Sequence, residues 1–293
     1  MNRFREKALI GVSWACGIIL SGIFFFLVAY LARQGAGVID LKLVFGETPP
    51  LEALLLRQRV FDGLFPAMVG TFLLVCLSIV LAVPLGVATG IYMAEYAGAR
   101  VKDLFNLVFD VLAGIPSILV GLFGFALAIF LHKHFSNRIQ PCLLISALAL
   151  AFLVLPYIIR TTQAALEGIP GETRLTALAL GATKPQNLFH VLIPQSLSGM
   201  LSGLILAIGR CAEDTAVIML TGVVVSAGVP TSLLGPYEAL PFYIYYISSQ
   251  YAGPEELLRG YGASLILLLL CTTLFFAAFL IKKRLTYLAL YRP

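Results

Sequence analysis

Six long apolar stretches constrain the fold of this 293-residue chain more than any other feature. A helix needs about 20 consecutive apolar residues to cross the hydrocarbon core of a bilayer. Backbone polar groups inside a bilayer must be hydrogen-bonded within the chain, so each stretch is predicted to be helical. The sequence therefore predicts an all-α polytopic membrane protein with six transmembrane helices. The stretches cover residues 9–32, 66–93, 111–131, 141–160, 197–225 and 261–281.

The composition excludes several classes of protein. Apolar residues make up 60% of the chain and charged residues 12%, whereas soluble domains carry about 25% charged residues. A soluble fold of this length could not bury so much apolar surface. An ordinary soluble enzyme, a disordered chain and a nucleic-acid-binding domain are therefore excluded, and no nucleic acid is expected as a partner.

The charged residues indicate the orientation of the chain in a lipid bilayer. With the N-terminus inside, twelve basic residues fall on inner segments and seven on outer segments, where seven acids balance them. The positive-inside rule then predicts that both termini lie in the cytoplasm. The inner basic residues are Arg3, Arg5, Lys7, Arg100, Lys102, Arg160, Arg174, Lys184, Lys282, Lys283, Arg284 and Arg292, and the outer ones are Arg33, Lys42, Arg57, Arg59, Lys133, Arg138 and Arg259.

The segments between the stretches suggest a domain organisation. We expect an anchor helix and outer loop over 1–65, a transmembrane core over 66–281, and a basic cytoplasmic tail over 282–293. Within the core, residues 100–113 have the pattern of an interfacial helix that leads into the third span. The inner loop 161–196 also reads as helix and ends at Pro194. Such a helix needs either the membrane surface or a cytoplasmic partner to pack against.

The chain carries no motif for catalysis. A phosphate-binding loop would end in Gly-Lys-Ser or Gly-Lys-Thr, and the dipeptide Gly-Lys occurs nowhere in the sequence. The patterns H-E-x-x-H, G-x-S-x-G and S-x-x-K are also absent from the sequence. We therefore predict that the chain is not an enzyme and has no catalytic residues, no metal site and no cofactor of its own.

The fifth stretch holds a charged cluster of Arg210, Glu213 and Asp214. A charge at the bilayer centre costs about 2.5–3.5 kcal/mol, so the three groups must pair or face a polar cavity. Either acid can meet the arginine, because they lie three and four residues from it on one helix. The cluster is either a scaffolding ion pair or the lining of a substrate pathway, in which the cation attracts an anion. The spacing leaves open which acid pairs with Arg210.

The inner loop resembles the EAA loop of ABC importer permeases. In that pattern a Glu-Ala-Ala triplet precedes a glycine, and Ile-x-Leu-Pro follows nine residues later. Gly181 and Val191-Leu192-Ile193-Pro194 match, Ala177 keeps the last residue of the triplet, and Leu175 and Thr176 replace the first two.

Further motifs are similar to those of PstA-type permeases of phosphate ABC importers. They include Pro84-Leu85-Gly86, Gly114-Ile115-Pro116, Leu155-Pro156 and the cluster Arg210-Cys211-Ala212-Glu213-Asp214-Thr215-Ala216. That family usually reads R-A-x-G-E-T-A at the cluster, so Asp214 replaces a glutamate and Glu213 is an additional acid.

The resemblance implies a type I ABC importer permease (MetI-like) fold in the bacterial plasma (inner) membrane. It implies that the chain forms half of a phosphate pathway and couples to a separate ATPase. The partners would be a homologous permease of PstC type, an ATP-binding subunit in two copies that holds ATP and Mg, and an extracytoplasmic phosphate-binding protein. The implied pathway residues are Arg210, Glu213, Asp214 and Thr215, and the implied coupling residues are Glu172, Arg174, Ala177, Gly181, Ala182, Val191 and Pro194.

Two alternatives remain open at this point. The first is an ABC permease for another oxyanion, such as molybdate or sulfate. The second is a protein that works alone, either a secondary transporter or a membrane enzyme. A self-sufficient transporter should show an internal repeat of its helices, and the two halves of this sequence show no obvious one.

Overall fold

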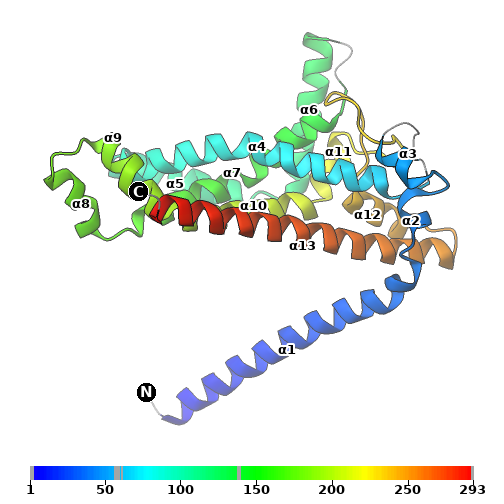
Figure 1. Cartoon of the computed structure of the whole chain (residues 1–293), viewed down its shortest axis with the longest axis horizontal. Coiled ribbons are helices and arrows are strands. Elements are labelled where there is room, and N and C mark those ends of the chain that lie inside the picture. Colours follow the sequence, from blue (N-terminus) through cyan, green and yellow to red (C-terminus); the bar gives the residue numbers. More distant parts are fainter. Residues whose placement is uncertain (1–2, 56–59, 61, 137–139, 292–293) are drawn as a thin grey trace.

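The computed structural model describes residues 3–55, 60, 62–136 and 140–291 (Figure 1). Arg57, Arg59, Arg138 and Arg292, which enter the charge count, lie outside the described residues. The described part is all-α, as predicted, and contains no β-strand beyond one isolated bridge between Val223 and Tyr237. Its helices are α1 (Arg3–Gly35), η1 (Ala36–Val38), α2 (Leu41–Phe45), α3 (Pro50–Leu54), α4 (Phe65–Glu95), α5 (Ala99–Ala113), α6 (Ser117–His134), α7 (Leu143–Glu167), α8 (Gly171–Ala179), α9 (Lys184–Asn187), the π-helical turn η2 (Leu188–Leu192), α10 (Ile193–Glu213), α11 (Ala216–Thr221), α12 (Leu240–Gln250) and α13 (Pro254–Tyr291).

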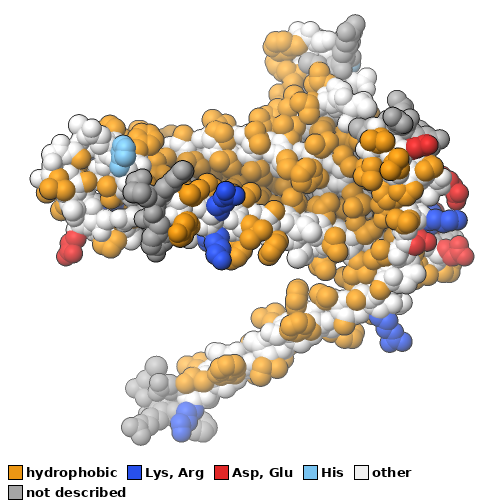
Figure 2. Space-filling view, in the orientation of Figure 1, with side chains coloured by type: hydrophobic (Ala, Val, Ile, Leu, Met, Phe, Trp, Pro, Cys, Tyr) orange, Lys and Arg blue, Asp and Glu red, His pale blue; other side chains and the backbone are white. Residues whose placement is uncertain are grey.

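Six helical segments of the described chain are long and apolar enough to cross a membrane, which confirms the predicted number. They are Leu9–Val38, Phe65–Glu95, Ser117–His134, Leu143–Glu167, Lys184–Glu213 and Pro254–Ala289. Figure 2 shows hydrophobic side chains over the middle of the elongated body, with the visible acidic side chains at its two ends. This distribution is the one expected of a protein whose sides face lipid.

Both termini and α8 lie toward the same end of the molecule (Figure 1). The opposite end carries α2, α3 and α12, so the two kinds of connecting segment are separated in space. At that opposite end α1 contacts α13 and then diverges from the body. The side chains of α1 are exposed over most of its length, including Trp14, Phe25 and Phe26.

The core of the bundle is built around α7, which packs against α4, α5, α6, α10 and α11. Glycines permit the closest approaches. A Cβ atom at Gly86 or Gly90 of α4 would lie 2.7 Å and 2.6 Å from atoms of Ile158 and Thr162. Gly203 of α10 faces Thr161 in the same way. The Gly86-x-x-x-Gly90 spacing of α4 and Gly203 of α10 therefore serve tight helix packing.

The fifth predicted span differs from the structure, since residues 197–225 do not form one helix. α10 ends at Glu213, Asp214 has an extended backbone with ψ 111°, and α11 resumes at Ala216. An interruption of this kind is tolerated at membrane depth only where the freed backbone groups find partners in the protein. The Asp214 carboxylate supplies one, because its Oδ1 accepts a hydrogen bond from the Val217 N–H at 2.9 Å.

The third and sixth predicted spans also have other boundaries. The helix predicted over 100–113 forms over Ala99–Ala113, but the span itself begins at Ser117 because Gly114 ends α5 and Pro116 precedes α6. α13 begins at Pro254 and continues to Tyr291, so the segment predicted as a tail from residue 282 is helical over its described part.

The loops contain more helix than their sequences suggested. The connection 33–65, between the first two predicted spans, holds η1, α2 and α3, and the connection 226–260, between the last two, holds α12. The inner connection is shorter than the predicted 161–196, because α7 continues to Glu167 and Pro194 lies in the first turn of α10.

Candidate functional site

The inner connection folds into a short helix with defined ends. α8 follows Pro170 and carries Glu172 in its first turn. Two backbone hydrogen bonds close its C-terminal end. Gly181 N–H bonds the Leu178 carbonyl at 3.0 Å, and Ala182 N–H bonds the Ala177 carbonyl at 3.0 Å. This pattern requires a left-handed residue, and Gly181 supplies it with φ +88°.

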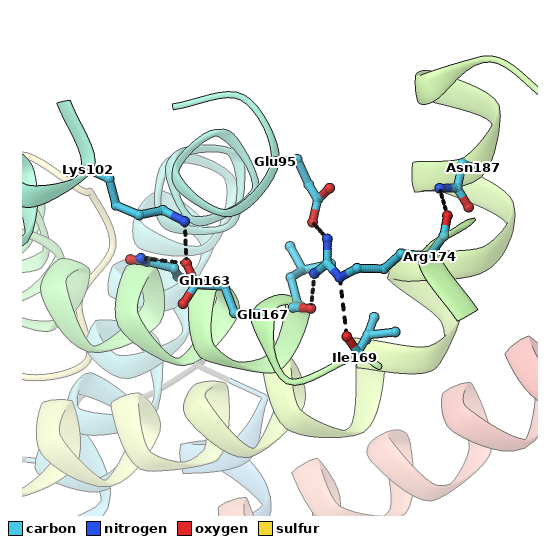
Figure 3. A network of polar contacts seen from close by, with 8 residues as sticks. Glu95, Lys102, Gln163, Glu167, Ile169, Arg174 and Asn187 are labelled. Atoms are coloured by element: carbon cyan, nitrogen blue, oxygen red, sulfur yellow. Dashed lines mark hydrogen bonds and ion pairs between the residues drawn. The ribbon is translucent and has the colours of Figure 1, made fainter. Parts of the chain in front are cut away.

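Arg174 anchors this helix to two membrane-spanning helices (Figure 3). Its Nη1 donates to Glu95 Oε1 at the end of α4, at 2.7 Å, while its Nη2 donates to the Leu166 carbonyl of α7. Its Nε donates to the Ile169 carbonyl at 3.2 Å, and its own carbonyl accepts from Asn187 Nδ2 at 2.9 Å. We call Glu95, Leu166, Ile169, Arg174 and Asn187 the Arg174 network.

A second polar contact lies beside this network and ties α5 to α7. Lys102 Nζ pairs with Glu167 Oε1 at 2.6 Å, and Gln163 Nε2 donates to the same carboxylate oxygen at 3.0 Å (Figure 3). The three helices α4, α5 and α7 are thus each joined to a neighbouring segment by a charged hydrogen bond. Such bonds are roughly twice as strong as neutral ones.

The structure separates the predicted coupling residues into two groups. Arg174 is turned inward with 24% of its side chain exposed, so it fixes the position of α8 rather than forming its surface. Val191 lies in η2 and Pro194 in the first turn of α10, both half-buried. Glu172 and Gly181 are exposed on or beside α8, and Ala177 and Ala182 are half-buried in the closing turn.

Three exposed apolar side chains accompany α8, and the sequence analysis did not include them among the coupling residues. Leu175, Leu180 and Phe189 are 63%, 85% and 64% exposed. All three are large apolar side chains in the connection between α7 and α10. The signal that could have identified Leu175 is the apolar replacement of the glutamate of the EAA pattern.

The charged cluster of α10 forms both ion pairs that the spacing allows. Arg210 Nη1 lies 3.0 Å from Glu213 Oε1, and Arg210 Nη2 lies 3.5 Å from Asp214 Oδ2. The two acids differ in exposure, since 64% of the Glu213 side chain is exposed and only 3% of the Asp214 side chain. The arginine therefore has one buried and one accessible partner.

A groove of about 640 Å³ opens in front of this cluster. Arg210 and Glu213 line it at one end, and Ser202 lines it at the other, where the Ser202 hydroxyl accepts a hydrogen bond from Lys282 Nζ at 2.7 Å. We call it the Arg210 groove, and its lining residues are Tyr157, Ser202, Ile205, Leu206, Gly209, Arg210, Glu213 and Phe275.

The predicted pathway residues are therefore close together, but only two of the four line the groove. Asp214 lies behind Arg210, and Thr215 begins α11 as its N-cap residue. The groove is level with Tyr157 and Phe275, which lie well inside α7 and α13. An arginine at this depth, facing a cavity beside a helix interruption, can bind an anion through two parallel N–H groups.

Comparisons with known proteins agree with this architecture. The family model described as "Binding-protein-dependent transport system inner membrane component" matches residues 86–287. The phosphate transport system permease protein PstA 1 of Mycobacterium tuberculosis (strain CDC 1551 / Oshkosh) is 34% identical over 230 residues, which cover 78% of this chain and 73% of the relative. The PstA protein of Yersinia pestis is 31% identical over 274 residues, which cover 92% and 88%.

Solved structures share the fold at low sequence identity. The inward-facing MetNI methionine ABC transporter matches with a TM-score of 0.55 and 21% identity over 81% of this chain and 99% of that one. A bacterial alginate ABC transporter, solved with an alginate-bound periplasmic protein, matches with a TM-score of 0.65 and 14% identity over 96% of each chain. The chain therefore belongs to the family of binding-protein-dependent transport system inner membrane components and, within it, to the PstA-type permeases.

Proposed function

We propose that this chain is a permease subunit of an ATP-driven importer of inorganic phosphate and forms half of its transmembrane pathway. The observation that carries the proposal is identity of 34% and 31%, over most of the chain, to permeases named for phosphate transport. The Arg210 groove supports it physically, because a guanidinium fork at membrane depth matches a tetrahedral oxyanion.

The partners follow from what this chain lacks and what it exposes. Its sequence has no phosphate-binding loop, so ATP and Mg would be bound by a separate ATP-binding subunit in two copies. The exposed Leu175, Leu180 and Phe189 would dock against that subunit, together with Glu172 and Gly181. A homologous permease of PstC type would supply the other half of the pathway, and an extracytoplasmic phosphate-binding protein would deliver the anion.

The proposed orientation places α8 and both termini in the cytoplasm and places α2, α3 and α12 outside. The positive-inside rule supports it, as does the location of both termini at the end of the molecule that carries α8 (Figure 1). In this orientation the exposed apolar residues of α8 face the compartment that contains ATP.

Coupling would travel through packed elements that are in direct contact. A movement of α8 reaches α4 and α7 through the Arg174 network, and α7 in turn packs along α10, which carries Arg210. ATP-driven closure of the partner subunits would thereby alter the groove between α7, α10 and α13. This is a two-state element whose equilibrium is biased by a ligand bound elsewhere.

Uptake of radiolabelled phosphate tests the proposal in cells that lack the chromosomal copy of this chain. We expect uptake to be lost and to be restored by the wild-type chain, and a stable ATPase to be isolated with the tagged chain. Restored uptake of molybdate or sulfate, without phosphate uptake, would support the alternative oxyanion permease. Full transport by the purified chain alone would contradict both.

A further inference from the structure

Glu213 and Asp214 share one arginine but are held in different ways. Asp214 is buried, and its two carboxylate oxygens are both used, Oδ1 by the Val217 N–H and Oδ2 by Arg210. Within the described residues, Glu213 accepts one side-chain hydrogen bond, from Arg210 Nη1 at 3.0 Å. Its side chain is largely exposed and lines the Arg210 groove. Glu213 is therefore the partner of Arg210 that an incoming anion meets.

The Arg210–Glu213 pair is weak enough to be displaced. It joins residues three apart on one helix, and 64% of the Glu213 side chain is exposed, so the pair contributes little to stability. An oxyanion that binds through two guanidinium N–H groups forms stronger, charge-assisted bonds. The Arg210–Asp214 contact differs, because releasing Asp214 would also remove the acceptor of the Val217 N–H at the helix interruption.

A displaced Glu213 carboxylate stays beside the bound anion and acts on it. An ionised carboxylate can only accept hydrogen bonds. Phosphate near neutral pH keeps at least one O–H and can donate it to Glu213, whereas sulfate has no proton and meets only repulsion. We propose, on the basis of the proposed function, that Glu213 makes the Arg210 groove selective for a tetrahedral oxyanion that still carries a proton.

The chain offers a matched pair of variants for the test. Glu213→Gln and Asp214→Asn each convert a carboxylate partner of Arg210 to an amide of the same shape, at neighbouring positions. Only Glu213 lines the groove. Glu213→Gln changes an exposed side chain, so it should fold and assemble like the wild type, and Glu213→Asp keeps the charge as a second control.

The measurement is equilibrium binding of radiolabelled phosphate and sulfate to the complex isolated with this chain, in lipid nanodiscs and without a binding protein. We expect the wild-type complex to prefer phosphate. Glu213→Gln should tighten sulfate binding about tenfold, which corresponds to about 1.4 kcal/mol. Phosphate binding should change less, because the loss of a charged acceptor offsets the relief of repulsion. Asp214→Asn and Glu213→Asp should keep the wild-type preference.

An unchanged ratio of phosphate to sulfate affinity in Glu213→Gln would overturn the inference, as would an equal shift in Asp214→Asn. If the isolated wild-type complex binds neither anion while cells that carry the chain still take up phosphate, the inference is overturned and the proposed function stands. Absence of any phosphate uptake that depends on the chain would overturn the proposed function itself, whatever the variants bind.

Discussion

Arg174 and Arg210 both pair with carboxylates, but the origins of their partners differ. The partners of Arg174 come from three segments: Glu95 lies at the end of α4, 79 residues away, while Leu166 and Ile169 lie eight and five residues before Arg174, at the end of α7 and in the turn that follows it. The partners of Arg210 lie three and four residues away, at the end of the same helix. Removing Arg174 would separate elements of the fold, whereas removing Arg210 would leave the packing of α10 in place.

The surroundings of the two arginines differ in the same sense. Glu95 is 17% exposed and Arg174 24%, and their other partners are backbone carbonyls that need a donor. Arg210 is 37% exposed and faces a groove. An arginine whose donors join separate elements of the fold stabilises it, while one with a displaceable partner on its own helix is available to a ligand.

The largest effect should come from Arg210→Ala. We expect phosphate uptake to fall by about 30- to 150-fold, since a charged hydrogen-bonding group to the anion is worth roughly 2–3 kcal/mol. The amount of assembled complex in the membrane should stay at the wild-type level. Arg210→Lys should retain part of the uptake, because lysine keeps the charge but lacks the planar fork. Wild-type uptake in Arg210→Ala would show that the cluster is scaffolding.

The next largest effect should come from Arg174→Ala, and it should appear as instability. The substitution removes the Arg174 donor from the Glu95 carboxylate and the Ile169 carbonyl, while the Leu166 carbonyl keeps the hydrogen bond from the Ile169 N–H. We expect a cost of about 2–3 kcal/mol. We expect faster proteolysis between residues 168 and 183 and a lower midpoint of thermal unfolding. Glu95→Gln keeps a hydrogen-bond acceptor and should lose less. Unchanged proteolysis in Arg174→Ala, with loss of ATPase docking, would instead make Arg174 a contact residue.

A smaller effect is expected from substitutions of Gly181, where the backbone conformation, and not the available space, disfavours a side chain. Its φ is +88°, and nothing lies within 4 Å of a Cβ atom built there. Any side chain should therefore cost about 1–2 kcal/mol in the left-handed conformation, and Gly181→Ala and Gly181→Leu should lower phosphate uptake and ATPase coupling to a similar extent. A strong dependence on side-chain size would show that the space is filled by the docked ATPase.

The sequence predicts the membrane spans well because length and hydropathy are local properties. It also predicts that Arg210, Glu213 and Asp214 lie together, because residues three and four apart on one helix are neighbours whatever the tertiary fold. The Arg174 network could not be predicted in this way. Glu95 and Arg174 are 79 residues apart, and only the packing of α4 against α7 brings them into contact.

The sequence does not predict the interruption at Asp214, for a different reason. Residues 197–225 are apolar enough to read as one span, and neither proline nor glycine stands at the break. α10 ends where the Asp214 carboxylate, in place of a backbone carbonyl, accepts the hydrogen bond from the Val217 N–H. A pattern of hydropathy carries no information about that competition.

Glu238, in the loop before α12, extends the comparison to a carboxylate that is bound by backbone N–H groups. Its Oε1 accepts from the N–H groups of Ala227 and Gly228 at 2.8 Å and 2.7 Å. Burial raises the pKa of this carboxyl above its ordinary value, although the two N–H donors oppose the shift. This group should give the smallest of the effects considered.

Because folding raises the pKa of Glu238, the folded state binds the proton more tightly than the unfolded state. The resulting stabilisation is complete below the ordinary pKa of a glutamate and is lost as the pH rises through the higher folded value. Glu238→Gln cannot titrate, so its thermal unfolding midpoint should fall less than that of the wild type across this pH window. Equal pH profiles would mean that the two backbone N–H donors keep the Glu238 carboxylate ionised. Oriented N–H groups would then stabilise the ionised Glu238 as well as Arg174 stabilises the ionised Glu95.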